Sequence, residues 1–205
     1  GQGNLRAGAA GHVGVNGGGG VVSIDVKSID CCVIGLGAMT GTGVQAPLGG
    51  ASVGVKVSSG DVQVGPIAAT GALSAITTDT NGNAKVCDNL NAGALLTLTS
   101  GSNGATFVPL GKTVTGGSMQ IFTPDLKVDG NIKSNTGNIN VDSNKAGGAL
   151  LVEMGNNSKI TAATNQGINF NGTLGAAGGK IDVIGQGDLS APGTGHVGVN
   201  GGTNH

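Results

Sequence analysis

The chain has 205 residues and a formal net charge of −1, with 43 glycines, three phenylalanines and neither tyrosine nor tryptophan. An apolar content of 38% at nearly zero net charge argues against intrinsic disorder. The chain has only ten Lys and Arg residues and almost no aromatic side chains on which bases could stack, which argues against a nucleic-acid partner. It contains no run of about 18 apolar residues, so the sequence predicts no membrane-spanning helix.

The beginning of the chain returns at its end. Residues 1–20 and 185–204 share thirteen of twenty positions at one constant offset. We interpret the chain as one period of something that repeats, within one polypeptide or by end-to-end stacking of subunits. The shared segment GHVGVN supplies the candidate assembly residues, which are Gly11, His12, Val13, Val15, Asn16, Gly195, His196, Val197, Val199 and Asn200.

A pair of small residues followed by a strand-like segment recurs along the chain. The spacing of these segments predicts about six coils of roughly 31 residues each. It is uneven, and the longest step runs from Ala51 to Ala94. The segments start at Val21, Ala51, Ala94, Ser118, Ala149 and Lys180.

Each of the last coils contains three short strand-like pieces separated by Gly and Asn. In residues 147–177 they are ALLVEM, SKITAA and GINFNG, and the third piece matches GNINVD and GHVGVN in the neighbouring coils. SIDVK, VGVKV and NINVD alternate apolar and polar residues as half-buried strands do. The prediction is one all-β domain over residues 1–205, a parallel β-helix whose coils bury their apolar faces by stacking.

Two features of this prediction have alternatives. A β-sandwich would use the same residue types with strands every 8–12 residues, but it does not explain the matching ends. The long step from Ala51 to Ala94 predicts an insertion over 69–83, placed as a loop or a short extra hairpin.

The three cysteines, Cys31, Cys32 and Cys87, fit no zinc spacing. Vicinal side chains on a strand point to opposite faces, so at most one of Cys31 and Cys32 pairs readily with Cys87. Either the cysteines are small buried apolar side chains, or a disulfide forms within the chain or between subunits.

No constellation indicates catalysis, and we expect neither an enzyme nor a cofactor. The carboxylates are spread singly, and His12 and His196 are the same position of the repeat. The segment from Asp79 resembles the front of a calcium loop, but Leu90 stands where an EF-hand needs a glutamate. A plain turn is the favoured interpretation, and a looser calcium site is the alternative; its candidate ligands are Asp79, Asn81, Asn83 and Asp88.

Residues 116–200 contain GNINVDS, GKIDVIGQGDLSA and KVDGNIKSNTGNINV. These phrases resemble the repeat region of filamentous-haemagglutinin-like adhesins and related large bacterial surface β-helix proteins. The resemblance implies a right-handed β-helix, export to the cell surface and a role in adhesion or matrix.

Two functions follow as expectations. The first is an extracellular structural protein, a solenoid protomer that partners itself head to tail in a filament or fibre. The alternative is the shaft or binding module of a surface adhesin that contacts glycans or a cell surface.

Overall fold

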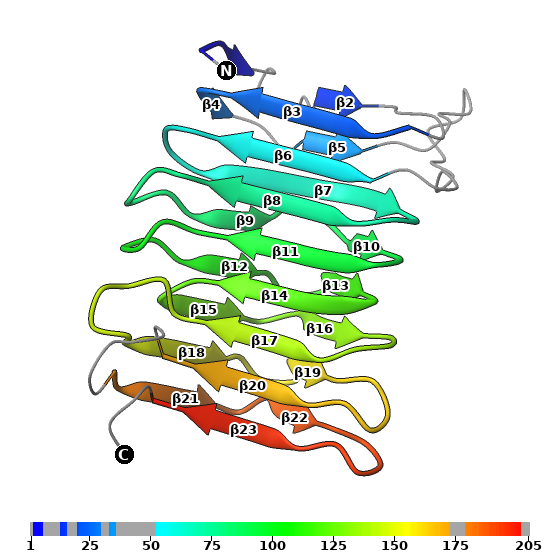
Figure 1. Ribbon diagram of the computed structural model, residues 1–205, viewed down its shortest axis with the longest axis vertical. Coiled ribbons are helices and arrows are strands. Elements are labelled where there is room, and N and C mark those ends of the chain that lie inside the picture. Colours follow the sequence, from blue (N-terminus) through cyan, green and yellow to red (C-terminus); the bar gives the residue numbers. More distant parts are fainter. Residues whose placement is uncertain are drawn as a thin grey trace.

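The computed structural model describes residues 2–5, 13–15, 20–29, 33–35, 52–172 and 179–201. These residues form strands and connections without a helix, and the strands pair in parallel. Figure 1 shows the strands stacked along the longest axis of the molecule, with β3 near one end and β23 at the other. The all-β, parallel character predicted from the sequence is therefore confirmed.

The 8-stranded sheet forms what we call the first ladder. Its strands, in order along the stack, are β3 (Val22–Val26), β6 (Val53–Val57), β8 (Leu73–Thr77), β11 (Leu95–Thr99), β14 (Ser118–Phe122), β17 (Ile139–Asp142), β20 (Ile168–Asn171) and β23 (Val197–Asn200).

The 13-stranded sheet contains two further ladders. The second ladder consists of β9 (Ala84–Val86), β12 (Thr106–Val108), β15 (Asp125–Val128), β18 (Leu150–Met154) and β21 (Ile181–Gly185). The third ladder consists of β10 (Leu90–Ala92), β13 (Thr113–Gly116), β16 (Asn131–Ser134), β19 (Lys159–Thr161) and β22 (Asp188–Ser190).

One long strand joins the second and third ladders. The first part of β7 (Val62–Ala69) pairs with β9, and its last part pairs with β10. The remaining strands of this sheet are β2 (Val13–Val15) and β5 (Val33–Gly35), which pair with each other, and β5 also pairs with β7. A separate two-stranded sheet holds β1 (Asn4–Leu5) and β4 (Ser28–Ile29).

From β8 onward the chain visits the three ladders in a fixed order, first, second, third, and then returns to the first. We call one such passage a rung. From β11 onward each new rung lies directly on the previous one, because every strand pairs with the strand three places earlier in the chain. Each rung thus contains one strand of each of the three ladders.

Alternating side chains produce the core. Strand β8 has buried Leu73, Ala75 and Thr77, and half-buried residues between them. The same alternation recurs in all three ladders, and the buried residues form one apolar cluster. Small and β-branched side chains suit this core because successive rungs lie only about 4.8 Å apart.

A column of hydroxyl groups is buried at the corner that follows the first ladder. Thr77, Ser100, Thr123 and Ser143 are all nearly inaccessible to solvent. The Ser100 hydroxyl donates to Thr123 Oγ1 at 2.9 Å, and Thr123 donates to the carbonyl oxygen of Asp125 at 2.7 Å. These bonds satisfy polar groups where the backbone leaves the strand and turns.

The predicted coil length is corrected by the register of the first ladder, whose rungs are unequal. Gln120 and Asn140 are paired neighbours with a sequence separation of 20, whereas Asn140 and Asn169 are paired neighbours with a separation of 29. The paired positions along the ladder are Val22, Val53, Leu73, Leu96, Met119, Ile139, Ile168 and Val197.

Eight strands of the first ladder thus replace the six longer coils that the sequence predicted. The number of coils was underestimated because the small-residue pairs do not all precede strands of the same ladder. The first four pairs precede strands of the first ladder, and the last two precede β18 and β21 of the second.

The predicted loop or extra hairpin over 69–83 is also corrected. This segment contains β8, which pairs with β6 on one side and with β11 on the other. The long step from Ala51 to Ala94 therefore consists of two short rungs rather than one rung with an insertion. Gly71 and Ala72 precede β8 and form the small-residue pair that the sequence analysis missed.

The alignment of the last coils is confirmed. GNINVD, GINFNG and GHVGVN contain β17, β20 and β23. These strands pair in sequence, with Ile139 opposite Ile168 and Ile168 opposite Val197. The pieces ALLVEM and SKITAA contain β18 and β19.

Candidate assembly surface at the C-terminal edge

In the last strand of the first ladder, β23, two side chains are exposed at positions whose equivalents in the preceding strands face the core. Val197 pairs with Ile168, and Val199 pairs with Phe170. Ile168 and Phe170 are each 0% exposed, whereas Val197 is 44% and Val199 59% exposed. The difference arises because a further rung covers the residues of β20, and none of the described residues covers those of β23.

The other two ladders end in the same way. Ile181 and Val183 of β21 and Leu189 of β22 are only partly buried against the core. Their partners one rung earlier, Leu150, Val152 and Ile160, are at most 2% exposed. We call these five residues the apolar edge: Ile181, Val183, Leu189, Val197 and Val199.

The backbone of this edge is open on one side. In the described part of the chain, β21, β22 and β23 each have a neighbouring strand on one side only. On the closed side, the amide of Ile168 donates to the carbonyl oxygen of His196 at 2.9 Å, and that of Gly172 donates to Asn200 at 2.7 Å. An open row of strand N–H and C=O groups is a template for pairing with another strand.

Amide side chains stack on the outer surface of the first ladder toward the same edge. The Asn169 side chain donates to Asn140 Oδ1 at 2.8 Å, and Asn171 donates to Asp142 Oδ1 at 2.6 Å. These bonds join neighbouring rungs through side chains as the ladder does through the backbone. The next positions along the two rows are Gly198 and Asn200, on the edge itself.

The structure places the second copy of the predicted assembly segment on this edge. Val197, Val199 and Asn200 belong to β23, and Gly195 and His196 immediately precede it. The His196 ring lies against the backbone of the previous rung, because a side chain added at Gly167 would contact its Cε1 atom at 2.8 Å. The assembly residues selected from the sequence did not include Ile181, Val183 or Leu189. Alternation in KIDVIG was a usable signal for the first two, and Leu189 lies within the duplicated end 185–204.

The first copy of the duplicated segment lies elsewhere. Val13 and Val15 belong to β2 of the 13-stranded sheet, whereas β23 belongs to the 8-stranded sheet. The two copies therefore do not occupy equivalent ladders. Gly11, His12 and Asn16 lie outside the described residues.

Cys87 is disulfide-bonded. Its backbone amide also donates to the carbonyl oxygen of Val64 at 2.8 Å, at the end of β9. The other two cysteines of the sequence, Cys31 and Cys32, lie outside the described residues.

The carboxylates of the candidate calcium ligands already accept hydrogen bonds. Asp79 accepts from the backbone amides of Gly60 at 2.6 Å and Asn81 at 2.9 Å, and these bonds lower the pKa of its carboxyl. Asp79 thus forms the turn that was the favoured interpretation. Asn83 is bonded to Asp61 by its amide groups, and its Oδ1 accepts from the amide of Ala105.

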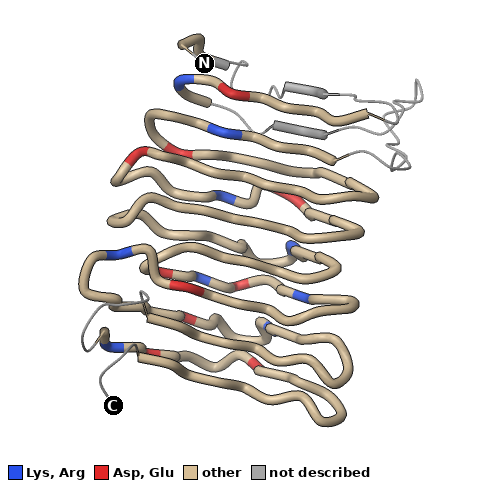
Figure 2. The backbone as a smooth tube through the Cα atoms, in the orientation of Figure 1, with Lys and Arg blue, Asp and Glu red and all other residues tan. Residues whose placement is uncertain are grey.

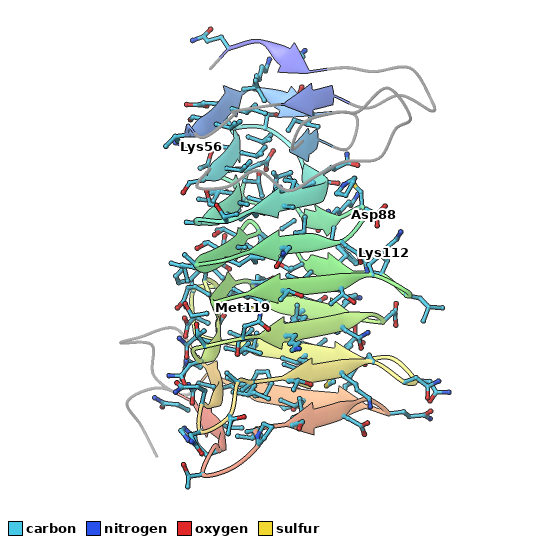
Figure 3. The ribbon with its side chains drawn as sticks, turned by 90° about the vertical axis from the view of Figure 1, so that its right-hand side faces the viewer. Lys56, Asp88, Lys112 and Met119 are labelled. Atoms are coloured by element: carbon cyan, nitrogen blue, oxygen red, sulfur yellow. The ribbon has the colours of Figure 1, made fainter. Side chains whose placement is uncertain are left out.

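The fourth candidate, Asp88, lies beyond the far end of β9 and forms an ion pair with Lys112 at 2.9 Å. Figure 3 shows these two side chains close together on the flank of the stack. Across the described residues, no three His, Cys, Asp or Glu side chains gather as metal ligands.

Charge is dispersed over the molecule. Figure 2 shows acidic and basic positions interspersed along the stack. Several ion pairs join adjacent rungs, including Lys127 with Glu153 at 3.0 Å and Lys85 with Asp61. No helix that could cross a membrane occurs in the part of the chain that the structure describes.

Comparisons with known proteins find no matching family model, no matching curated protein and no matching solved structure.

Proposed function

We propose that the chain is a β-solenoid protomer that stacks head to tail into an extracellular structural filament. The observation that carries this proposal is the apolar edge, where core-type side chains are half-exposed beside open strands. A rung added at about 4.8 Å would pair the open backbone groups and bury the apolar side chains together.

A second copy of this chain is the occupant that we favour. The similarity of residues 1–20 and 185–204 suggested a joint in which one copy continues the stack of the other, but the two similar segments lie in different sheets. The support from the structure is that β3, at the other end of the first ladder, also has a neighbouring strand on one side only in the described chain. Such a joint is heterologous and does not close, so it generates a filament rather than a dimer. The disulfide at Cys87 supports an oxidising, extracellular location.

The alternative is that a longer polypeptide provides the next rung, as in the shaft of a surface adhesin. The apolar edge supports this function too, because the following residues of one chain would cover it equally well. The resemblance of 116–200 to haemagglutinin-like repeats favours a shaft, and it stays a prediction.

Sedimentation velocity and negative-stain electron microscopy of the purified chain test the proposal. We expect filaments that grow with protein concentration, and we expect Val197→Asp combined with Val199→Asp to leave folded monomers. The matched control is Leu110→Asp, because Leu110 is 75% exposed and lies between β12 and β13, away from the edge. Monomers of the unmodified chain at every concentration, or filaments of the double variant, would contradict head-to-tail stacking.

A further inference from the structure

A hollow lies on the outer surface of the second ladder and extends to β21, the strand whose Ile181 and Val183 belong to the apolar edge. Its volume is about 560 Å³, within the range of small-molecule sites. Strands β15, β18 and β21 contribute Asp125, Leu151 and Asp182 to its lining, and the connection between β17 and β18 contributes Lys145 and Ala149.

The ladder register spaces the two carboxylates. Asp125 pairs with Leu151, and Leu151 pairs with Asp182, so the two acidic residues lie on one row with an apolar residue between them. Two ladder spacings separate their Cα atoms by about 9.6 Å. The row therefore presents an acidic group, an apolar patch and a second acidic group to whatever enters the hollow.

The wall beside this row is held in place by hydrogen bonds. The Asn144 side chain donates to the carbonyl oxygen of Ser100 at 2.7 Å, reaching from the segment after β17 to the end of β11. The Ser143 hydroxyl donates to the carbonyl oxygen of Ala149 at 2.6 Å. The connection is thus bonded at both ends, and the hollow is built into the fold.

One acceptor in the hollow has no donor among the described residues. Asp125 Oδ1 is buried without a hydrogen-bond partner, and Oδ2 is 3.6 Å from the Lys127 ammonium. Burial raises the pKa of the Asp125 carboxyl, and the Glu153 charge adds to this effect against the opposing Lys127 charge. Oδ1 itself is closed to solvent, but the Asp125 side chain is 28% exposed, so a ligand in the hollow meets the carboxylate through Oδ2.

The composition of the lining restricts the class of ligand. Asp125 and Asp182 are balanced by Lys145 and Lys180, so neither an anion nor a cation is favoured by net charge. Within the described chain, no aromatic residue lines the hollow, which argues against a flat aromatic ligand. A hydroxyl group both donates and accepts, so a neutral polyhydroxylated ligand suits carboxylates and ammonium groups side by side.

We propose that this hollow binds one unit of a neutral saccharide, with a sugar hydroxyl donating to Asp125 Oδ2. A second hydroxyl donates to Asp182, and a C–H face of the ring packs on Leu151. This inference goes beyond filament formation. Asp182 lies on β21 beside the apolar edge, but its side chain alternates with those of Ile181 and Val183 and belongs to the outer surface of the stack.

The test is a titration of the full chain with methyl glycosides of glucose, galactose, mannose and N-acetylglucosamine, followed by saturation-transfer NMR. We expect at least one glycoside to bind, and Asp125→Asn and Asp182→Asn each to weaken it by about tenfold or more. The matched control is Asp188→Asn, because Asp188 is 70% exposed on β22 of the third ladder and does not line the hollow.

The same titrations on the Val197→Asp and Val199→Asp double variant separate sugar binding from stacking. Unchanged binding there supports the site whether or not filaments form. Three results would overturn the proposal: no glycoside binds, the hollow variants bind as well as Asp188→Asn, or calcium chloride alone binds and Asp125→Asn removes that binding.

Discussion

The largest fully buried side chain of the described core is Phe170, and it sits directly beneath the apolar edge. It pairs with Val141 on one side and Val199 on the other. Because one neighbour is half-exposed, the packing of Phe170 depends on a rung that is itself incompletely covered.

We expect Phe170→Ala to lower the free energy of unfolding by about 3–5 kcal/mol, because it leaves a cavity in a close-packed stack. Phe122 is the matched control, since it is 36% exposed on the outer surface of the same ladder. Phe122→Ala should cost less than about 1 kcal/mol. Denaturant unfolding monitored by circular dichroism measures both values, and equal losses would contradict the burial of Phe170.

The ion pair of Asp88 makes part of the stability depend on pH. The hydrogen bond from Lys112 lowers the pKa of Asp88, and the backbone amide of Asn89 adds to this effect. A carboxyl with a lowered folded-state pKa stabilises the fold above its unfolded value of about 3.9, and this contribution is lost as pH falls through the folded value.

We therefore expect the unmodified chain to lose more stability than Asp88→Asn between about pH 5 and pH 3. The reciprocal variant Lys112→Met should also flatten this dependence, because it removes the cation that lowers the pKa. Urea unfolding midpoints across this interval measure the effect. Parallel pH profiles for all three proteins would show that the pair does not contribute.

At the scale of elements, glycines bring the corners of neighbouring rungs into close contact. Gly82 and Gly104 occupy equivalent corners, and a Cβ added at Gly104 would overlap the carbonyl oxygen of Gly82. A Cβ added at Gly82 would in turn overlap the carbonyl oxygen of Gly60. The obstruction is backbone, so a neighbouring rotamer cannot relieve it.

We expect Gly104→Ala to lower the free energy of unfolding by about 1–3 kcal/mol, the usual cost of overpacking. Gly54→Ala is the matched control, because the nearest atom to its added Cβ is the Ser74 hydroxyl oxygen at 3.3 Å, which can rotate away. Thermal unfolding of the two variants distinguishes them. A Gly104→Ala protein as stable as Gly54→Ala would contradict the close approach of these corners.

The sequence was informative about strands and less so about rungs. Alternation identified VGVKV and NINVD, because a two-residue period places every second side chain in the core. Rung length was overestimated, because Gly and Ala pairs mark corners and each rung has several corners. Nothing in the local sequence tells which ladder a given pair precedes.

The sequence predicted only part of the apolar edge, because local sequence does not show which strands end beside one another. The duplicated ends identified Val197 and Val199 as candidates, but the other residues of the apolar edge belong to β21 and β22. Ile181 and Leu189 join the apolar edge only because the second and third ladders end at the same level. The hollow beside Asp125 could not be predicted, since it depends on the register among three rungs.

At the scale of the whole molecule, each rung contacts mainly the rungs above and below it. Stability in such a stack is approximately a sum of rung terms and interface terms. The strands β21, β22 and β23 have one interface in the described chain, so they should open before the central strands.

Hydrogen exchange measured by mass spectrometry checks this order. We expect slow exchange in β11, β14 and β17 and fast exchange in β21 to β23 at low protein concentration. Raising the concentration should protect β21 to β23 selectively, because stacking pairs their open backbone groups. Uniform protection at all concentrations would contradict both the open edge and its occupation by a second copy.

The unequal rungs have a mechanical consequence. The hydrogen bonds between strands run along the stack, so tension applied between its two ends would load them one rung at a time. A rung occupies about 4.8 Å of folded length, but the chain within it reaches roughly 65–105 Å when fully extended. Single-molecule force curves should therefore show two sizes of contour-length increment, and the longer increments near the C-terminal end would come from the two rungs between β17 and β23.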